Sequence, residues 1–134
     1  MSPTLVLELP MPDHRLSING ARRTHPAVLR QIKRAHKEAA RLAALALIPP
    51  HERPAFPAGA RIRVTVDVER RRGGRRWDNS GIIEAMKPYM DGFEESGALY
   101  ANDQQLDWVA VTWDERPTGR GVVTLTFTSA PAFP

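Results

Sequence analysis

Three groups of residues in this sequence have side chains of the kind that act on phosphate. A glycine-containing run comes first, with five arginines: Arg70, Arg71, Arg72, Arg75 and Arg76. The step Asp78-Asn79 follows this run directly, and a second acidic turn at Asp103 comes later in the chain. Hydrolysis of a phosphodiester with Mg²⁺ or Mn²⁺ needs carboxylates close together, because these hard cations bind oxygen ligands and must keep positions open for water and phosphate. The residues therefore indicate metal-dependent chemistry on a phosphodiester if the fold brings Asp78 and Asp103 together.

The segment 75–106 resembles the core of the RusA-type Holliday-junction resolvases, which are found in bacteria and their phages. The family pattern runs Asp-x-Asp-Asn, then Lys-x-x-x-Asp, then Asp-Asp followed by a polar residue. The matching residues here are Asp78-Asn79, Lys87, Asp91 and Asp103. The rest of the chain matches only in the order of its predicted elements.

The resemblance implies that Asp78 and Asp103 ligate Mg²⁺, with Mn²⁺ as a substitute, and that Lys87 assists catalysis or grips the DNA backbone. The sequence departs from the pattern twice, because Arg76 and Asn102 stand where the family has aspartates. A third oxygen ligand would then have to come from the outward face of the preceding strand. Asp67 is the expected third ligand there, with Glu69 as the alternative.

The resemblance further implies a homodimeric endonuclease that resolves four-way DNA junctions in recombination or repair. Phosphate contacts are expected from the five arginines, from Asn79, and from Arg22 and Arg23, with affinity that falls steeply as salt rises. Such contacts carry little sequence information, so the shape of the junction would decide what is bound. Paired nicks need two sites related by a two-fold axis, which a C2 dimer supplies. Four apolar residues are candidates for its interface: Met86, Tyr89, Met90 and Phe93.

Each of these residues also has a structural interpretation. The arginine run is typical of a solvated loop, Asp78 of a helix cap, and Asp103 of a turn. Lys87 and Asp91 are spaced to form a surface ion pair. Trp77, Trp108 and Trp113 are candidates for stacking on exposed bases, but the last two lie in a predicted strand, which favours packing. The alternative function is a non-catalytic DNA-binding protein that retains the resolvase fold.

Composition restricts the class of protein. Residues 1–134 have the length of one domain, and 42% hydrophobic with 25% charged residues is typical of a globular chain. The net charge of +4 favours a polyanionic partner. The chain has no cysteine, so any metal must be held by oxygen or histidine. We find no apolar run long enough for a membrane span and no secretory signal, and we expect a cytoplasmic protein that does not associate with membranes.

The first half of the chain has three periodic segments. Residues 4–9 alternate as a strand, 26–47 have helical periodicity, and 61–69 alternate as a second strand. The polar segment 13–25 is expected to be a loop. The expected apolar stripe of the helix is Val28, Ile32, Ala35, Ala39, Leu42 and Ala46.

The second half predicts one helix and two strands. Because proline is tolerated only in the first turn of a helix, Pro88 predicts a loop or short turn to about Ala85 and a helix to about Glu95, which Gly97 ends. Strands over 106–115 and 121–128 are expected to pair as an antiparallel hairpin, and residues 129–134 to be disordered. The predicted fold is α/β of the α+β type, a small mixed sheet of about four strands with two helices in the order β-α-β-α-β-β.

Overall fold

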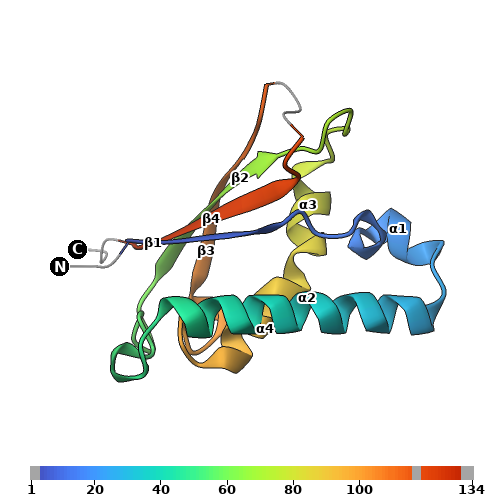
Figure 1. Ribbon diagram of the computed structural model, residues 1–134. Coiled ribbons are helices and arrows are strands. Elements are labelled where there is room, and N and C mark those ends of the chain that lie inside the picture. The colour runs from blue at the N-terminus through green and yellow to red at the C-terminus, as the bar shows by residue number, and fades with distance from the viewer. Residues whose placement is uncertain (1–3, 116–118, 131–134) are drawn as a thin grey trace.

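The computed structural model describes residues 4–115 and 119–130, which form a sheet covered on one face by helices (Figure 1). The strands are β1 (Thr4–Pro10), β2 (Ile62–Glu69), β3 (Leu106–Trp113) and β4 (Val122–Ser129). The sheet order is β1-β4-β2-β3, with β2 and β3 parallel and the other pairs antiparallel. The α+β class and the element order β-α-β-α-β-β are therefore confirmed.

The predicted hairpin of the last two strands is wrong. β4 lies between β1 and β2, whereas β3 pairs with the other side of β2 and forms an edge of the sheet. The inward side chains of β4, Val123, Leu125 and Phe127, are fully buried, while β3 leaves Val109 55% exposed. β4 has a neighbouring strand on each side, which shields its inward side chains, whereas β3 is paired on one side alone.

The long helix α2 (Pro26–Leu47) has the predicted bounds but not the predicted buried face. Its deeply buried residues are Ala40 and Ala44, whereas Ala35, Ala39, Leu42 and Ala46 of the expected stripe are exposed. The many alanines make several stripes of this helix look apolar. The packed face is selected by α4, since Gly92 of α4 lets the two backbones approach closely; a Cβ there would lie 2.1 Å from the Lys37 carbonyl oxygen.

The helical segment after β2 is broken at Met86 into α3 (Asn79–Ala85) and α4 (Lys87–Ser96). Pro88 lies in the first turn of α4 and Gly97 ends this helix with a left-handed φ of 65°, both as predicted. The segment before Ala85 is a helix, although a loop or short turn was expected, because the break at Met86 leaves room for a complete short helix before the proline.

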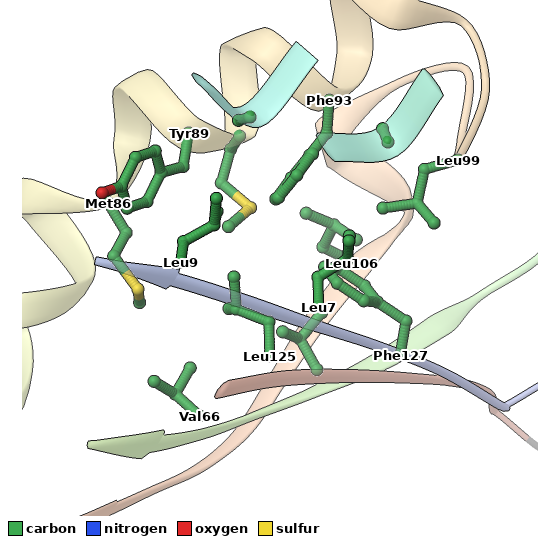
Figure 2. Packing of buried hydrophobic residues seen from close by; sticks show 14 of the residues in the cluster. Leu7, Leu9, Val66, Met86, Tyr89, Phe93, Leu99, Leu106, Leu125 and Phe127 are labelled. Atoms are coloured by element: carbon green, nitrogen blue, oxygen red, sulfur yellow. The ribbon is translucent and has the colours of Figure 1, made fainter. Parts of the chain in front are cut away.

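The four apolar residues assigned to a dimer interface lie in the core of the single chain (Figure 2). Met86 and Phe93 are fully buried, and Tyr89 and Met90 are at most 4% exposed. Tyr89 donates a hydrogen bond to the Pro10 carbonyl oxygen over 2.6 Å, which ties α4 to the end of β1. The prediction that these side chains form a dimer interface is therefore wrong, because they pack against the sheet inside one chain.

Two segments are more ordered than expected. The predicted loop 13–25 contains a 3-10 turn, η1 (His14–Leu16), and a short helix, α1 (Ile18–Arg22), which the Ser17 hydroxyl caps by accepting from the Gly20 amide. Ser129 belongs to β4, and the Ala130 amide donates to the Arg61 carbonyl oxygen, so the predicted disordered tail begins too early. Residues 131–134 lie outside the described residues. In the described parts of the chain, every helix is too short or too polar to cross a membrane.

Candidate nucleic-acid interface

The arginine loop (residues 70–76) is anchored to the sheet by Arg70. Its Nε donates to Oδ1 of Asp114 over 2.7 Å, its backbone amide donates to Oδ2, and its Nη1 reaches the Gly74 carbonyl oxygen. Burial alone would raise the pKa of the Asp114 carboxyl, but the hydrogen bonds from Arg70 hold this pKa below its ordinary value. The Arg70 side chain is only 11% exposed. It therefore holds the loop in place and is not available to contact phosphate, which corrects its assignment as a DNA-binding residue.

The other arginines of the loop are exposed: Arg71, Arg72, Arg75 and Arg76. The aliphatic part of Arg71 packs where a Cβ at Gly121 would lie, and the Arg76 guanidinium lies 5.8 Å from the centre of the Trp113 ring. Both contacts restrict side chains that otherwise have many rotamers. Phosphate binding by a restricted guanidinium costs less conformational entropy than binding by a free one.

A hollow of about 540 Å³ lies beside the arginine loop, and we call it the loop hollow. One wall is the loop itself with Trp77. Another is the segment 10–14, which begins at the last residue of β1, and the third is the middle of α2. In the wall formed by the arginine loop, Arg71 and Arg75 are cationic, and Trp77 contributes a half-buried indole. Cationic and aromatic groups are thus gathered at one opening.

His36 of α2 lies in the wall of the loop hollow and is held in one tautomer. Its Nε2 accepts from the Asp13 amide over 3.0 Å, so Nδ1 carries the proton and donates to the Ile32 carbonyl oxygen at 2.9 Å. The ring stacks on Tyr89 with centroids 5.0 Å apart. Burial lowers the pKa of His36. The Asp13 carboxyl has its pKa lowered to about 2, chiefly by the side-chain hydrogen bond from Arg15.

Asp78 stands at the start of α3 and lines a second hollow of about 380 Å³ with His14, Ser17 and Asn19. Within the described residues its carboxylate makes no capping hydrogen bond to α3, so the helix-cap interpretation does not account for it. Its neighbour Asn79 accepts a hydrogen bond through Oδ1 from Trp113 Nε1 over 2.8 Å. The Asn79 oxygen is therefore used within the fold.

Asp103 lies far from Asp78. It begins a 3-10 turn, η3 (Asp103–Gln105), directly before β3, whereas the Asn79–Trp113 hydrogen bond places the start of α3 at the far end of β3 (Figure 1). A strand of eight residues extends over roughly 23 Å. No single cation in one chain can therefore contact both carboxylates, and the predicted pairing of Asp78 with Asp103 is wrong for one chain.

Neither candidate for the third ligand lies beside Asp78. Asp67 is exposed on the sheet face opposite the helices, because its neighbours Val66 and Val68 point into the core. Glu69 is on that same face, where Nε of Arg120 lies 3.3 Å from its Oε2 without hydrogen-bond geometry. Across residues 4–115 and 119–130, no group of three or more histidine or acidic side chains could hold a metal ion. The predicted Mg²⁺ ligand set thus does not fit one chain.

Lys87 and Asp91 do not line the hollow that contains Asp78. They line a third hollow, the α2 groove, of about 680 Å³, together with Arg22. Lys87 Nζ lies 3.0 Å from Oε2 of Glu84, so it forms a surface pair one turn back along the chain. Further cations of α2 line the same groove: Arg30, Lys33, Arg34 and Lys37. Arg23, at the end of α1, is exposed.

The loop hollow was not predicted from the sequence. Its residues Asp13, His36 and Trp77 come from three separated segments, and their spacing along the chain carries no motif. Only the run of arginines beside Trp77 indicated this region. Sequence reasoning correctly took Trp108 and Trp113 as packing residues, since Trp113 is 8% exposed and Trp108 packs against the core.

We compared the chain with known proteins. Neither the models of known protein families nor the curated proteins contain a match to this chain. The resemblance to the RusA-type resolvases stays a prediction from the motif in segment 75–106.

Proposed function

We propose that the protein is a cytoplasmic DNA-binding protein that contacts the phosphates of branched DNA through the exposed arginines of the arginine loop. The observation that carries this proposal is the anchoring of that loop by Arg70 on Asp114, beside four exposed guanidinium groups. Guanidinium groups on an anchored loop can bind phosphate oxygens through bidentate hydrogen bonds. This function is non-catalytic, and it does not require Asp78 and Asp103 to lie close together.

The experiment compares a synthetic four-way junction with a linear duplex of the same length and sequence. Binding is followed by fluorescence anisotropy at several salt concentrations. The test variant replaces four loop arginines by alanine: Arg71, Arg72, Arg75 and Arg76. The matched variant removes four cations of the α2 groove: Arg22, Arg30, Lys33 and Arg34.

The junction is expected to bind more tightly than the duplex, and binding should be lost only in the loop variant. Equal affinity for junction and duplex would refute the preference for branched DNA. Loss of binding only in the groove variant would move the interface to α2. No binding of either DNA by the wild-type chain would refute the proposal as a whole.

The second candidate is the metal-dependent junction endonuclease implied by the resemblance. The uncapped carboxylate of Asp78, in a hollow beside the arginine loop, favours it. Asp78 and Asp103 lie far apart within one chain. Endonuclease activity therefore requires a homodimer in which one protomer supplies Asp78 and its partner supplies Asp103. The interface would have to use surfaces other than the buried face of α4.

Mixing two inactive variants tests this arrangement. Asp78→Asn and Asp103→Asn should each abolish nicking of a junction in Mg²⁺ or Mn²⁺ while junction binding survives. If the site is shared between protomers, a mixture of the two variants regains activity, because each mixed dimer retains one complete site. Nicking by the wild type without recovery in the mixture would refute the shared site. Absence of nicking in both metals would refute the endonuclease.

A further inference from the structure

The loop hollow combines an aromatic face with cations beside an opening. Trp77 packs one side against the core and lines the hollow with the rest of its indole. Arg71 and Arg75 line the same hollow. Within the hollow the Asp13 carboxylate is already neutralised by Arg15, whose Nη2 lies 2.7 Å from its Oδ2. The wall therefore presents net positive charge next to an indole.

The size of the hollow suits a small ligand. About 540 Å³ falls within the range of roughly 300–1,000 Å³ that is usual for small-molecule sites. The far wall is formed by Pro10, Met11 and the His36–Tyr89 stack. Its side chains are apolar, except for the His36 ring and the Tyr89 hydroxyl, which already form hydrogen bonds within the fold. An apolar wall with few free polar atoms receives a flat ring better than a strongly hydrated ion.

We propose that the loop hollow binds one unpaired nucleotide, with its base against the Trp77 indole and its phosphate at Arg71 or Arg75. The inference rests on the proposed DNA binding and specifies what the same surface selects. Every base has a π-face, so stacking on an indole tolerates any sequence. A paired base is stacked between its neighbours and cannot enter, so the hollow selects strands with an unpaired nucleotide.

The other tryptophans do not offer such a surface. Trp113 is 8% exposed, and its ring nitrogen is occupied by Asn79. Trp108 lies on the edge strand β3 and packs against the core, far from the arginine loop in sequence. Trp77 directly follows the arginine loop in the chain and lines both the loop hollow and the hollow of Asp78.

Tryptophan fluorescence tests the contact directly. In a Trp108→Phe background, titration with single-stranded oligo-dT and with dAMP should quench the emission, while inorganic phosphate should not. The quenching should vanish when Trp77→Phe is added. Equal quenching by phosphate would identify an anion site without a base. Quenching that survives Trp77→Phe, or no quenching by oligo-dT, would overturn the proposal.

An affinity comparison separates this inference from the proposed function. We compare a duplex that contains a short single-stranded gap with an intact duplex of equal length. Trp77→Leu should lower affinity for the gapped duplex by about tenfold, the usual order for loss of one base–aromatic stack, and leave the intact duplex unaffected. Trp77→Phe should retain most of the affinity for the gapped duplex.

Each outcome has a distinct meaning. An equal loss on both DNAs in Trp77→Leu, or no loss on either, would overturn the nucleotide site while DNA binding stands. Failure of the wild type to bind any DNA would refute the proposed function itself. Circular dichroism checks whether Trp77→Leu is folded; if it is not, the loss of quenching in Trp77→Phe still decides the question.

Discussion

The indole Nε1 of Trp113 donates a hydrogen bond to Oδ1 of Asn79 over 2.8 Å, and this bond joins the last residue of β3 to the first residue of α3. Asp78 immediately precedes Asn79, so the bond also positions the carboxylate that the sequence singled out. It holds the arginine loop between two anchored ends, with Arg70 on Asp114 at one end and Asn79 on Trp113 at the other.

Removing the acceptor should destabilise the fold. Asn79→Ala leaves the ring nitrogen of Trp113, a largely buried residue, without this partner, and should lower the free energy of unfolding by about 1–2 kcal/mol. Asn79→Asp keeps an oxygen in the same place and serves as the matched control. Urea denaturation measures both. Equal stability of Asn79→Ala and the wild type would show that the bond contributes nothing.

Protonation of His36 should weaken the fold at mildly acidic pH. The pKa of His36 is lowered in the folded state, so the unfolded chain binds the proton more readily, and stability is lost as pH falls below about 6.5. Protonated Nε2 can no longer accept from the Asp13 amide. The Asp13 carboxylate favours the charged ring, but burial outweighs it.

The measurement is the urea midpoint at pH 7.5 and pH 5.5. The midpoint of the wild type should fall over this interval more than that of His36→Phe, which keeps an aromatic ring against Tyr89. A decline of the same size in both proteins would assign the pH dependence to other groups.

The salt dependence of DNA binding should identify the arginines that meet phosphate. Arg75→Ala with Arg76→Ala removes two exposed cations, so the slope of log affinity against log salt should become shallower by about two. Lys33→Ala with Arg34→Ala in the α2 groove removes the same charge and should leave the slope unchanged. The reverse pattern would place the phosphates at α2.

The contact between α2 and α4 should tolerate no larger residue at position 92. In Gly92→Ala the new Cβ would lie 2.1 Å from the Lys37 carbonyl oxygen and 3.0 Å from the Ala40 Cβ, so the helices must separate. The expected loss of unfolding free energy is about 1–3 kcal/mol, despite the roughly 1 kcal/mol that alanine gains in helix propensity. Gly97→Ala, where no atom is close but φ is 65°, separates backbone strain from crowding. Thermal denaturation measures the effect, and a melting temperature of Gly92→Ala equal to that of the wild type would contradict the predicted crowding.

The residues of several elements were sufficient to predict them. Alternation of apolar and polar residues identified the inward face of β2, and Gly97 marked the end of α4. These features depend on neighbours in the chain, because side chains alternate across a strand and a left-handed helix end favours glycine. The arginine loop was likewise predicted from its composition.

The buried face of α2 and the partner of each strand required the tertiary structure. An alanine-rich helix has several faces of similar apolarity, and the close approach of α4 at Gly92 selects one of them. Two consecutive strands with a short connection predict a hairpin, but β4 packs between β1 and β2, where its fully buried side chains cover more of the core.

The same long-range pairing decided the candidate site. The α+β class, the order of the elements and the arginine loop could be predicted from local residue patterns alone. The tertiary structure decided that β2 and β3 run parallel, so the chain between them must start at one end of the sheet and return to the other. Asp78 and Asp103 stand at the two ends of that connection, which separates them by the length of a strand, while folding brings Trp77, His36 and Asp13 to one hollow.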